Sequence, residues 1–185
     1  MKRILALVTL VVLLAGCGSG DTGMDRALAV RNRLQSGGCG FDCRITADYG
    51  DKTYTFGMDC QADNSGNVAF TVTEPDSIAG ITGTVSNQGG KLTFDQVALA
   101  FELLADDQVT PVSGPWILIR TLQGGYLTSC TEEDNLLHLS VNDSYEADAL
   151  KLDIWLDGDD RPVRGEILYG GRRILSLEVS NFEYL

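Results

Sequence analysis

The chain has 185 residues and carries 26 acidic against 14 basic side chains, a formal net charge of −12 with its single histidine neutral. This length is typical of one domain. An acidic protein is repelled by phosphate backbones and by anionic lipid head groups. The composition therefore argues against nucleic acid as a partner and against purely electrostatic attachment to a membrane.

The first residues have the organisation of an export signal. Lys2 and Arg3 are basic, and an apolar run of 11 residues follows at 4–14. A helix needs about 20 apolar residues to cross the hydrocarbon core of a bilayer. The run is too short for a membrane span and is typical of a signal peptide, so we predict that residues 1–16 are removed from the mature protein.

The signal ends in the stretch Leu13-Leu14-Ala15-Gly16-Cys17. This stretch resembles the lipobox of bacterial lipoproteins, in which the cysteine takes a diacylglyceryl thioether and becomes the first residue of the mature chain. The resemblance implies that Cys17 carries two or three acyl chains, which suffice for stable anchoring. The alternative is an ordinary secretory signal that leaves Cys17 as a plain thiol.

The lipobox interpretation places the protein on the extracytoplasmic face of a cell membrane, held by its first residue. After the cysteine, residues 18–23 contain only glycine, serine, aspartate and threonine, so residues 17–23 are predicted to form a short flexible tether with the lipid at its start. Removing the signal with its two basic side chains leaves 169 residues and takes the formal charge from −12 to −14.

The folded domain is expected at 24–185 and begins with a helix. Residues 24–36 have the spacing of an amphipathic helix, with Asp25 in the first turn and Arg33 in the last, as the helix dipole favours. Gly37-Gly38 ends this helix.

The most regular pattern follows at 39–62. Apolar and cysteine side chains occupy odd positions up to residue 49 and then mostly even positions from residue 52. A period of two predicts two half-buried strands, and Gly50-Asp51 between them suits a two-residue turn. Such a turn pairs residues whose numbers sum to 101, so Ile45 is expected to face Phe56.

Most of the remaining chain is predicted to form further strands. They are expected at 68–72, 80–86, 91–94, 97–104, 136–141, 150–156, 163–169 and 173–182. Ser113-Gly114-Pro115 opens a second helix, which ends at Gly124-Gly125 and has Ser113 as its expected cap. Because this helix is apolar on most sides, we expect it to be buried.

These elements predict an α+β fold, with one long antiparallel sheet that is apolar on one side and two helices as its covers. The element order, the segment TEPDSIAGI at 73–81 and the last three strands are similar to the LolA/LolB-type lipoprotein carrier fold. They also resemble exported lipoproteins of spore-forming bacteria, including germination lipoproteins. The resemblance covers most of 24–185. It implies a curved antiparallel sheet forming an unclosed β-barrel, with an N-terminal helix, an inner plug helix and a concave side that can hold an acyl chain.

Four cysteines follow Cys17 in the mature chain: Cys39, Cys43, Cys60 and Cys130. An even number in an exported chain predicts two disulfides. The register places Cys60 diagonal to Cys39 and Cys43, so one of these two is expected to bridge Cys60 and the other Cys130. The alternative is that one pair stays as buried thiols. The spacing lacks the C-x-x-C of zinc knuckles and redox motifs, so no metal site is predicted.

Several apolar side chains are candidates to line a ligand pocket: Tyr54, Phe56, Phe70, Trp116, Ile117 and Ile119. A packed core uses the same residue types, so both interpretations stay open. His138 lies between two leucines of a strand and is expected to face solvent. The acidic groups at 132–134 and 157–160 are expected to be solvated turns, because the EF-hand spacing is absent. Without a nucleophile elbow or a phosphate loop, the sequence predicts no catalytic residue and no cofactor.

Two functions follow from these observations. The first is a membrane-anchored, non-catalytic interaction or structural module of the cell envelope, with the membrane and an envelope protein as partners. The second is a carrier or sensor that binds a lipid or another apolar ligand in the concave face of the sheet. An enzyme is disfavoured by the single histidine and the lack of a catalytic motif.

Overall fold

The computed structural model describes residues 22–94, 97–101, 104–105, 108–146 and 149–185. The predicted signal peptide, Cys17 and most of the tether lie outside these residues. Within the described chain, 11 strands form one antiparallel sheet, two short strands form a separate ribbon, and two α-helices accompany them.

The bounds of the elements follow the chain. The large sheet contains β1 (Cys39–Asp48), β2 (Thr53–Ala62), β3 (Val68–Glu74), β4 (Thr82–Ser86), β5 (Gly89–Phe94), β6 (Val97–Phe101), β9 (Tyr126–Glu133), β10 (Leu136–Asn142), β11 (Lys151–Leu156), β12 (Pro162–Tyr169) and β13 (Arg172–Tyr184). The ribbon pairs β7 (Leu104–Ala105) with β8 (Gln108–Val109). The helices are α2 (Thr22–Ser36) and α3 (Gly114–Gly124), which follows the 3₁₀ turn η1 (Pro111–Ser113).

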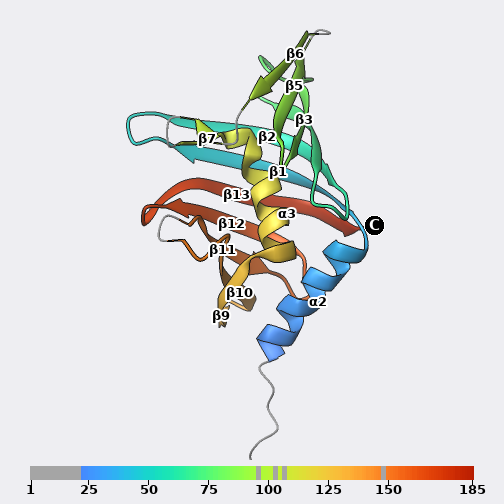
Figure 1. Cartoon of the computed structure of the whole chain (residues 1–185), viewed down its shortest axis with the longest axis vertical. Coiled ribbons are helices and arrows are strands. Elements are labelled where there is room, and N and C mark those ends of the chain that lie inside the picture. Colours follow the sequence, from blue (N-terminus) through green and yellow to red (C-terminus); the bar gives the residue numbers. More distant parts are fainter. Residues whose placement is uncertain (1–21, 95–96, 102–103, 106–107, 147–148) are drawn as a thin grey trace, which may run out of the picture.

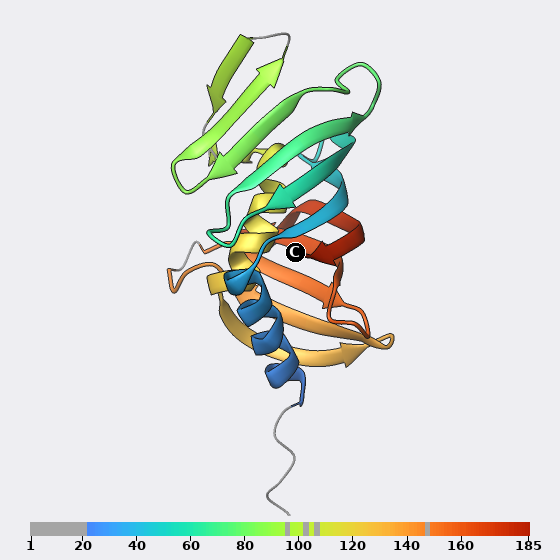
Figure 2. The ribbon, with the colours of Figure 1, turned by 90° about the vertical axis from the view of Figure 1, so that its right-hand side faces the viewer.

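The sheet curves without closing. Its strand order is β6-β5-β4-β3-β2-β1-β13-β12-β11-β10-β9, so the last strand lies beside the first and joins two meanders. The edge strands β6 and β9 do not pair with each other, which leaves the barrel open. Both helices lie on the concave side of the sheet (Figures 1 and 2). The predicted α+β fold with an unclosed barrel is confirmed.

The register predicted for the first hairpin is also confirmed. Ile45 pairs with Phe56, and the pairing holds from Cys39 opposite Ala62 to Asp48 opposite Thr53. Ile45 and Phe56 are both buried. A shift by one residue would turn the whole apolar set to solvent, so burial of this face maintains the register.

Two local predictions are wrong. Strand β9 was not expected, because its side chains are mostly exposed on both faces and show no apolar alternation. It is an edge strand that pairs only with β10. Glu132 and Glu133 belong to this strand, and the turn is formed by Asp134 and Asn135 with positive φ. Ser113 does not cap α3 with its side chain, because its hydroxyl donates to the carbonyl oxygen of Thr110 at 2.6 Å.

Helix α3 fills the concave side of the sheet, as its apolar sequence predicted. Leu118 and Ile119 are fully buried, and Arg120 and Gly124 are the helix residues that reach solvent. The helix begins in direct contact with the sheet at Gly114, where a Cβ would lie 3.0 Å from a methyl carbon of Leu177. The absence of a side chain there lets α3 approach β13 closely.

The C-terminal end of α3 is held by side chains of α2. Arg31 donates from Nε to the carbonyl oxygen of Leu122 at 3.1 Å and from Nη2 to that of Gly125 at 2.6 Å. Gln35 donates to the carbonyl oxygen of Gln123 at 2.8 Å, and the Gln123 side chain donates back to a carbonyl of α2 at 2.8 Å. The last carbonyls of a helix lack intrahelical partners and carry partial negative charge, so Arg31 supplies both hydrogen bonds and charge.

Helix α2 is itself fixed where it joins the sheet. The N–H of Leu185 donates to the carbonyl oxygen of Gly38 at 2.9 Å. A Cβ on Gly37 would lie 2.4 Å from the carbonyl oxygen of Leu185, and one on Gly38 would lie 2.4 Å from that of Ala62. The connection passes between β2 and the C-terminus through a space that admits only glycine.

Among the described residues, no helix combines the length and the apolar character that crossing a bilayer requires.

We expect Arg31→Ala to lower the free energy of unfolding by about 2–3 kcal/mol, because two buried carbonyls lose a charged hydrogen-bond donor. Urea denaturation measures this change. The control is Arg173→Ala, which removes an exposed ion pair to Glu166 at 3.0 Å and is expected to cost about 0–1 kcal/mol. Equal losses for the two variants would contradict a special role for Arg31.

Candidate functional site

The concave face is the first candidate site, because the predicted pocket residues come from it. Five of the six candidates are buried in one core, with exposures of 8% or less: Phe56, Phe70, Trp116, Ile117 and Ile119. Tyr54 is 50% exposed near the start of β2, and its ring lies against that of Tyr49 with 6.2 Å between centroids. The structure brings the five together as packed core and leaves Tyr54 at its margin.

A small pocket remains beside α3. Its volume is about 220 Å³, and it is lined by Val109, Trp116, Ile117, Arg120, Thr121, Asp143 and Leu150. The Arg120 guanidinium lies 5.2 Å from the centre of the Trp116 ring. Burial raises the pKa of Asp143, and the charge of Arg120 opposes this rise. Sites for drug-sized ligands measure about 300–1,000 Å³, so this pocket falls below that range.

The cysteine cluster lies in the same core. Cys60 is opposite Phe41 and diagonal to Cys39 and Cys43, as predicted. These three residues are free, buried thiols in the structure. Burial raises the pKa of Cys39 and of Cys43 to about 12 and raises that of Cys60 well above its ordinary value. Thiolates are the reactive form, so these thiols are poor nucleophiles at neutral pH.

The disulfides expected for an exported chain are not formed among the described cysteines. Diagonal neighbours on paired strands are about 7–8 Å apart, beyond the range of about 4.4–6.8 Å between Cα atoms of a disulfide. Cys130 lies on β9, and strands β13 to β10 separate it from β1. A bridge from Cys39 or Cys43 to Cys130 therefore does not fit this fold.

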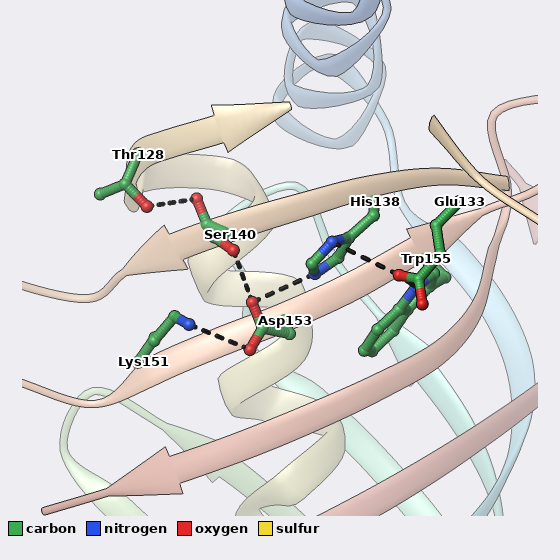
Figure 3. A network of polar contacts seen from close by, with 7 residues as sticks. All are labelled: Thr128, Glu133, His138, Ser140, Lys151, Asp153 and Trp155. Carbon is green, nitrogen blue, oxygen red and sulfur yellow. Dashed lines mark hydrogen bonds and ion pairs between the residues drawn. The ribbon is translucent and has the colours of Figure 1, made fainter. Parts of the chain in front are cut away.

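The second candidate site is a row of side chains on the convex face (Figure 3). Trp155 of β11 pairs with His138 of β10 on one side and with Arg164 of β12 on the other. The imidazole stacks on the indole with 4.5 Å between centroids and an angle of 8°, and the guanidinium lies 3.6 Å from the indole centre. The indole N–H donates to Glu133 at 2.9 Å. Trp155 is thus covered by polar neighbours, although it points away from the main core.

Sequence reasoning did not select Trp155. Trp155 could have been selected only from its pairing with His138 across β10 and β11. That pairing depends on the length and path of the connection between the two strands. His138 was predicted to face solvent, and it does point away from the core on the convex side. Its side chain is nevertheless only 20% exposed, because the indole covers it.

Ser140, His138 and Asp153 meet on this face, but their order does not suit nucleophilic catalysis (Figure 3). The Ser140 hydroxyl donates to Asp153 Oδ1 at 2.5 Å, and the same oxygen lies 3.2 Å from His138 Nε2. In a catalytic triad the serine contacts the histidine, which removes its proton. Here the carboxylate stands between the two, so the arrangement ties β10 to β11.

Several partners hold Asp153 in its charged form. Burial acts to raise the pKa of Asp153, but hydrogen bonds from Ser140 and Lys151, the charge of Lys151 and the contact with His138 outweigh it and lower the pKa. Lys151 Nζ lies 3.2 Å from Oδ2. The charged carboxylate is therefore an integral part of this face.

The polar row continues across the other half of the sheet. Arg164 pairs with Glu178, and Glu178 pairs with Arg44. Gly57 lies between Arg44 and Glu74 in the register, and Arg44 Nη2 reaches over it to Glu74 Oε2 at 2.5 Å. A shallow hollow of about 470 Å³ lies here, with Asp42, Arg44, Glu74 and Glu178 among its lining residues. The convex face thus presents both signs of charge to solvent.

The acidic turn at 157–160 has a structural role. Asp157 Oδ1 accepts hydrogen bonds from the N–H groups of Asp159 and Arg161, both at 2.9 Å. Asp160 binds Arg26 of α2 at 2.7 Å. Over the ranges that the structure describes, no group of three or more His, Cys, Asp and Glu side chains is arranged to hold a metal ion.

Comparison with known proteins supports the fold. A LolA superfamily protein from Nitrosomonas europaea superposes with a TM-score of 0.50 at 12% identity, over 86% of this chain and 93% of that chain. An uncharacterised conserved protein from Thermus thermophilus gives 0.49 at 10% identity, over 88% and 87% of the two chains. The Mycobacterium tuberculosis lipoprotein LppX gives 0.40 at 13% identity, over 88% and 96%. The first of these superpositions confirms the predicted LolA-like fold, and at 12% identity the likeness concerns the fold alone.

In comparisons of sequence, no family model matches the chain and no curated protein matches it.

We expect Asp153→Asn to lower the free energy of unfolding at pH 7 by about 1–3 kcal/mol, because its donors lose a charged acceptor. A carboxylate whose pKa is lowered by folding stabilises the protein above its unfolded pKa, and this stability is lost as the pH falls through the folded pKa. The difference from the unsubstituted protein should therefore shrink below about pH 4. Urea denaturation at several pH values measures it, with Asp159→Asn in the exposed turn as the control.

Proposed function

We propose that the mature chain is a membrane-anchored, non-catalytic interaction or structural module of the cell envelope. The observation that carries this proposal is the filling of the concave face. Leu118 and Ile119 of α3 are fully buried against the sheet, and the pocket left beside the helix measures about 220 Å³. With the inner face occupied around α3, the convex face and the sheet edges are the surfaces available to partners.

The second part of the proposal is a lipid anchor at the N-terminus of the mature chain. Residues 1–16 act as the signal peptide, Cys17 carries the lipid, and the predicted tether at 17–23 joins it to the domain, although its last two residues already belong to α2. Since α2 begins at Thr22, about five residues separate the lipid from folded structure. Five extended residues reach roughly 17 Å. The domain is therefore held close to the extracytoplasmic face of the membrane, with the start of α2 nearest to the bilayer.

The convex face supports an interaction role through its chemistry. Its exposed side chains include Arg44 and Glu74, which are about half exposed and carry opposite charges. Mixed charges of this kind set partner specificity and orientation more than they set affinity. The arrangement of Ser140, Asp153 and His138 does not suit catalysis. The carboxylate of Asp153 lies next to Ser140, where a catalytic histidine would have to lie.

The carrier function remains the alternative, and the pocket beside α3 is the observation that favours it. Its walls include Trp116, Ile117 and Leu150, and Arg120 lies at its edge. A lipid carrier built on this fold would need α3 to move outward, which requires the contacts of Arg31 and Gln35 with α3 to open.

Uptake of a fluorescent fatty acid distinguishes the two functions. We expect the purified protein to bind no dye and to carry no lipid detectable by mass spectrometry. Trp116→Ala should enlarge the pocket into the range of about 300–1,000 Å³ and allow uptake.

The matched control is Trp155→Ala, because Trp155 is similarly buried but lies on the convex face. Both variants are expected to lose about 3–5 kcal/mol of stability, so circular dichroism must show that each is folded at the assay temperature. Dye binding or bound lipid in the unsubstituted protein would support the carrier function instead.

The anchor is tested separately with Cys17→Ser. We expect this variant to stay unprocessed or to appear in the soluble fraction, and globomycin should have the same effect on the unsubstituted protein. Membrane fractionation and immunoblotting measure both. A Cys17→Ser protein that remains in the membrane after signal cleavage would show that the anchor lies elsewhere.

A further inference from the structure

The two edges of the sheet differ in their protection. Strand β9 ends in Glu132 and Glu133, its pairing with β10 is interrupted by a bulge at Ser140, and α2 packs against it. Charges, bulges and covering elements are the means by which proteins block edge-to-edge pairing. Strand β6, at the other edge, has none of these within Val97–Phe101, and its pairing with β5 is regular.

The apolar concave surface continues to this unprotected edge without a cover. Leu99 pairs with Leu92, and Val97 pairs with Phe94. Through β4 these residues lie on the same side of the sheet as the buried Phe70. Val97, Leu99 and Phe94 are nevertheless 61%, 63% and 55% exposed. We call Leu92, Phe94, Val97 and Leu99 the β6 patch.

Among the described residues, no element covers the β6 patch. The tether joins the start of α2, which packs near β9 at the opposite end of the molecule (Figure 1). Ten strand spacings separate β6 from β9, about 48 Å along the sheet. The tether reaches roughly 17 Å when extended, so it is too short to run along the sheet from α2 to β6.

The charge of this edge does not oppose a second copy of the same chain. Most surfaces of a protein with a net charge of −12 repel another copy. Strands β4, β5 and β6 contain one charged residue, Lys91, and no carboxylate. Asp95 and Glu102, which flank β6 in sequence, lie outside the described residues.

We infer that β6 pairs antiparallel with β6 of a second copy, so that the two sheets become one across a two-fold axis. The strand is self-complementary in this arrangement. Leu99 meets Leu99 of the partner subunit, and Ala98 meets Ala100 of the partner subunit. Pairing satisfies the open backbone edge of both copies, and the apolar stripes of the two patches become continuous.

The pair is weak in free solution and forms where the chain is concentrated. A five-residue edge buries less than the roughly 1,200 Å² of a standard stable interface. Confinement to a membrane raises the effective concentration of a second copy without any new contact. The inference rests on the proposed lipid anchor at Cys17, which supplies this confinement, and not on the role proposed for the convex face.

Cross-linking in native membranes tests the pairing. Leu99→Cys is introduced in a Cys130→Ser background, because Cys39, Cys43 and Cys60 are buried and the thiol of Cys17 carries the lipid. A short bis-maleimide should then give an adduct of twice the monomer mass, because paired Cα atoms lie about 4.5–5.5 Å apart. The control is Tyr145→Cys in the same background, with an exposure of 83%.

The expected yield of dimer is about tenfold higher for Leu99→Cys than for Tyr145→Cys. Adding Val97→Lys to the Leu99→Cys chain should abolish its adduct, since the substitution places a cation on each edge. An unchanged melting temperature for Val97→Lys shows that folding is intact. Three results overturn the inference: no adduct, an adduct that is not twice the monomer mass, or equal dimer for Tyr145→Cys.

Discussion

The contact between Arg31 and the carbonyl end of α3 determines what the concave face can do. A helix end buried without partners leaves carbonyl groups unsatisfied, each at a cost of about 1–3 kcal/mol. Arg31 satisfies the carbonyls of Leu122 and Gly125, and Gln35 satisfies that of Gln123. Because these donors come from α2, which is itself locked at Gly37 and Gly38, α3 stays inside the sheet. The filled inner face follows from this chain of contacts.

Because α3 fills the inner face, the two sides of the sheet carry different kinds of side chain. On the concave side, aliphatic and aromatic side chains pack around α3 and leave a pocket of about 220 Å³. On the convex side, cross-strand neighbours form a polar row from His138 through Arg164 to Arg44. The row stabilises the sheet through stacking and ion pairs, and it also presents the charges by which a partner could be recognised.

Local alternation made part of this structure predictable. The pairing of Ile45 with Phe56 follows from a two-residue turn, and the burial of α3 follows from its apolar composition. Contacts between distant segments were not predictable, because they depend on how the connecting loops run through space. Examples are the hydrogen bonds from Arg31 to α3, the stacking of His138 on Trp155, and the distance in the sheet between Cys130 and Cys39. Strand β9 was missed because an exposed edge strand needs no apolar periodicity.

The position of β13 between β1 and β12 has a consequence for the timing of folding. The final strand joins the two meanders, so neither half has its central neighbour until Arg172–Tyr184 is available. A chain that is synthesised from its N-terminus therefore cannot close its core early. Completion of the domain waits for β13, and the two meanders stay separate until then.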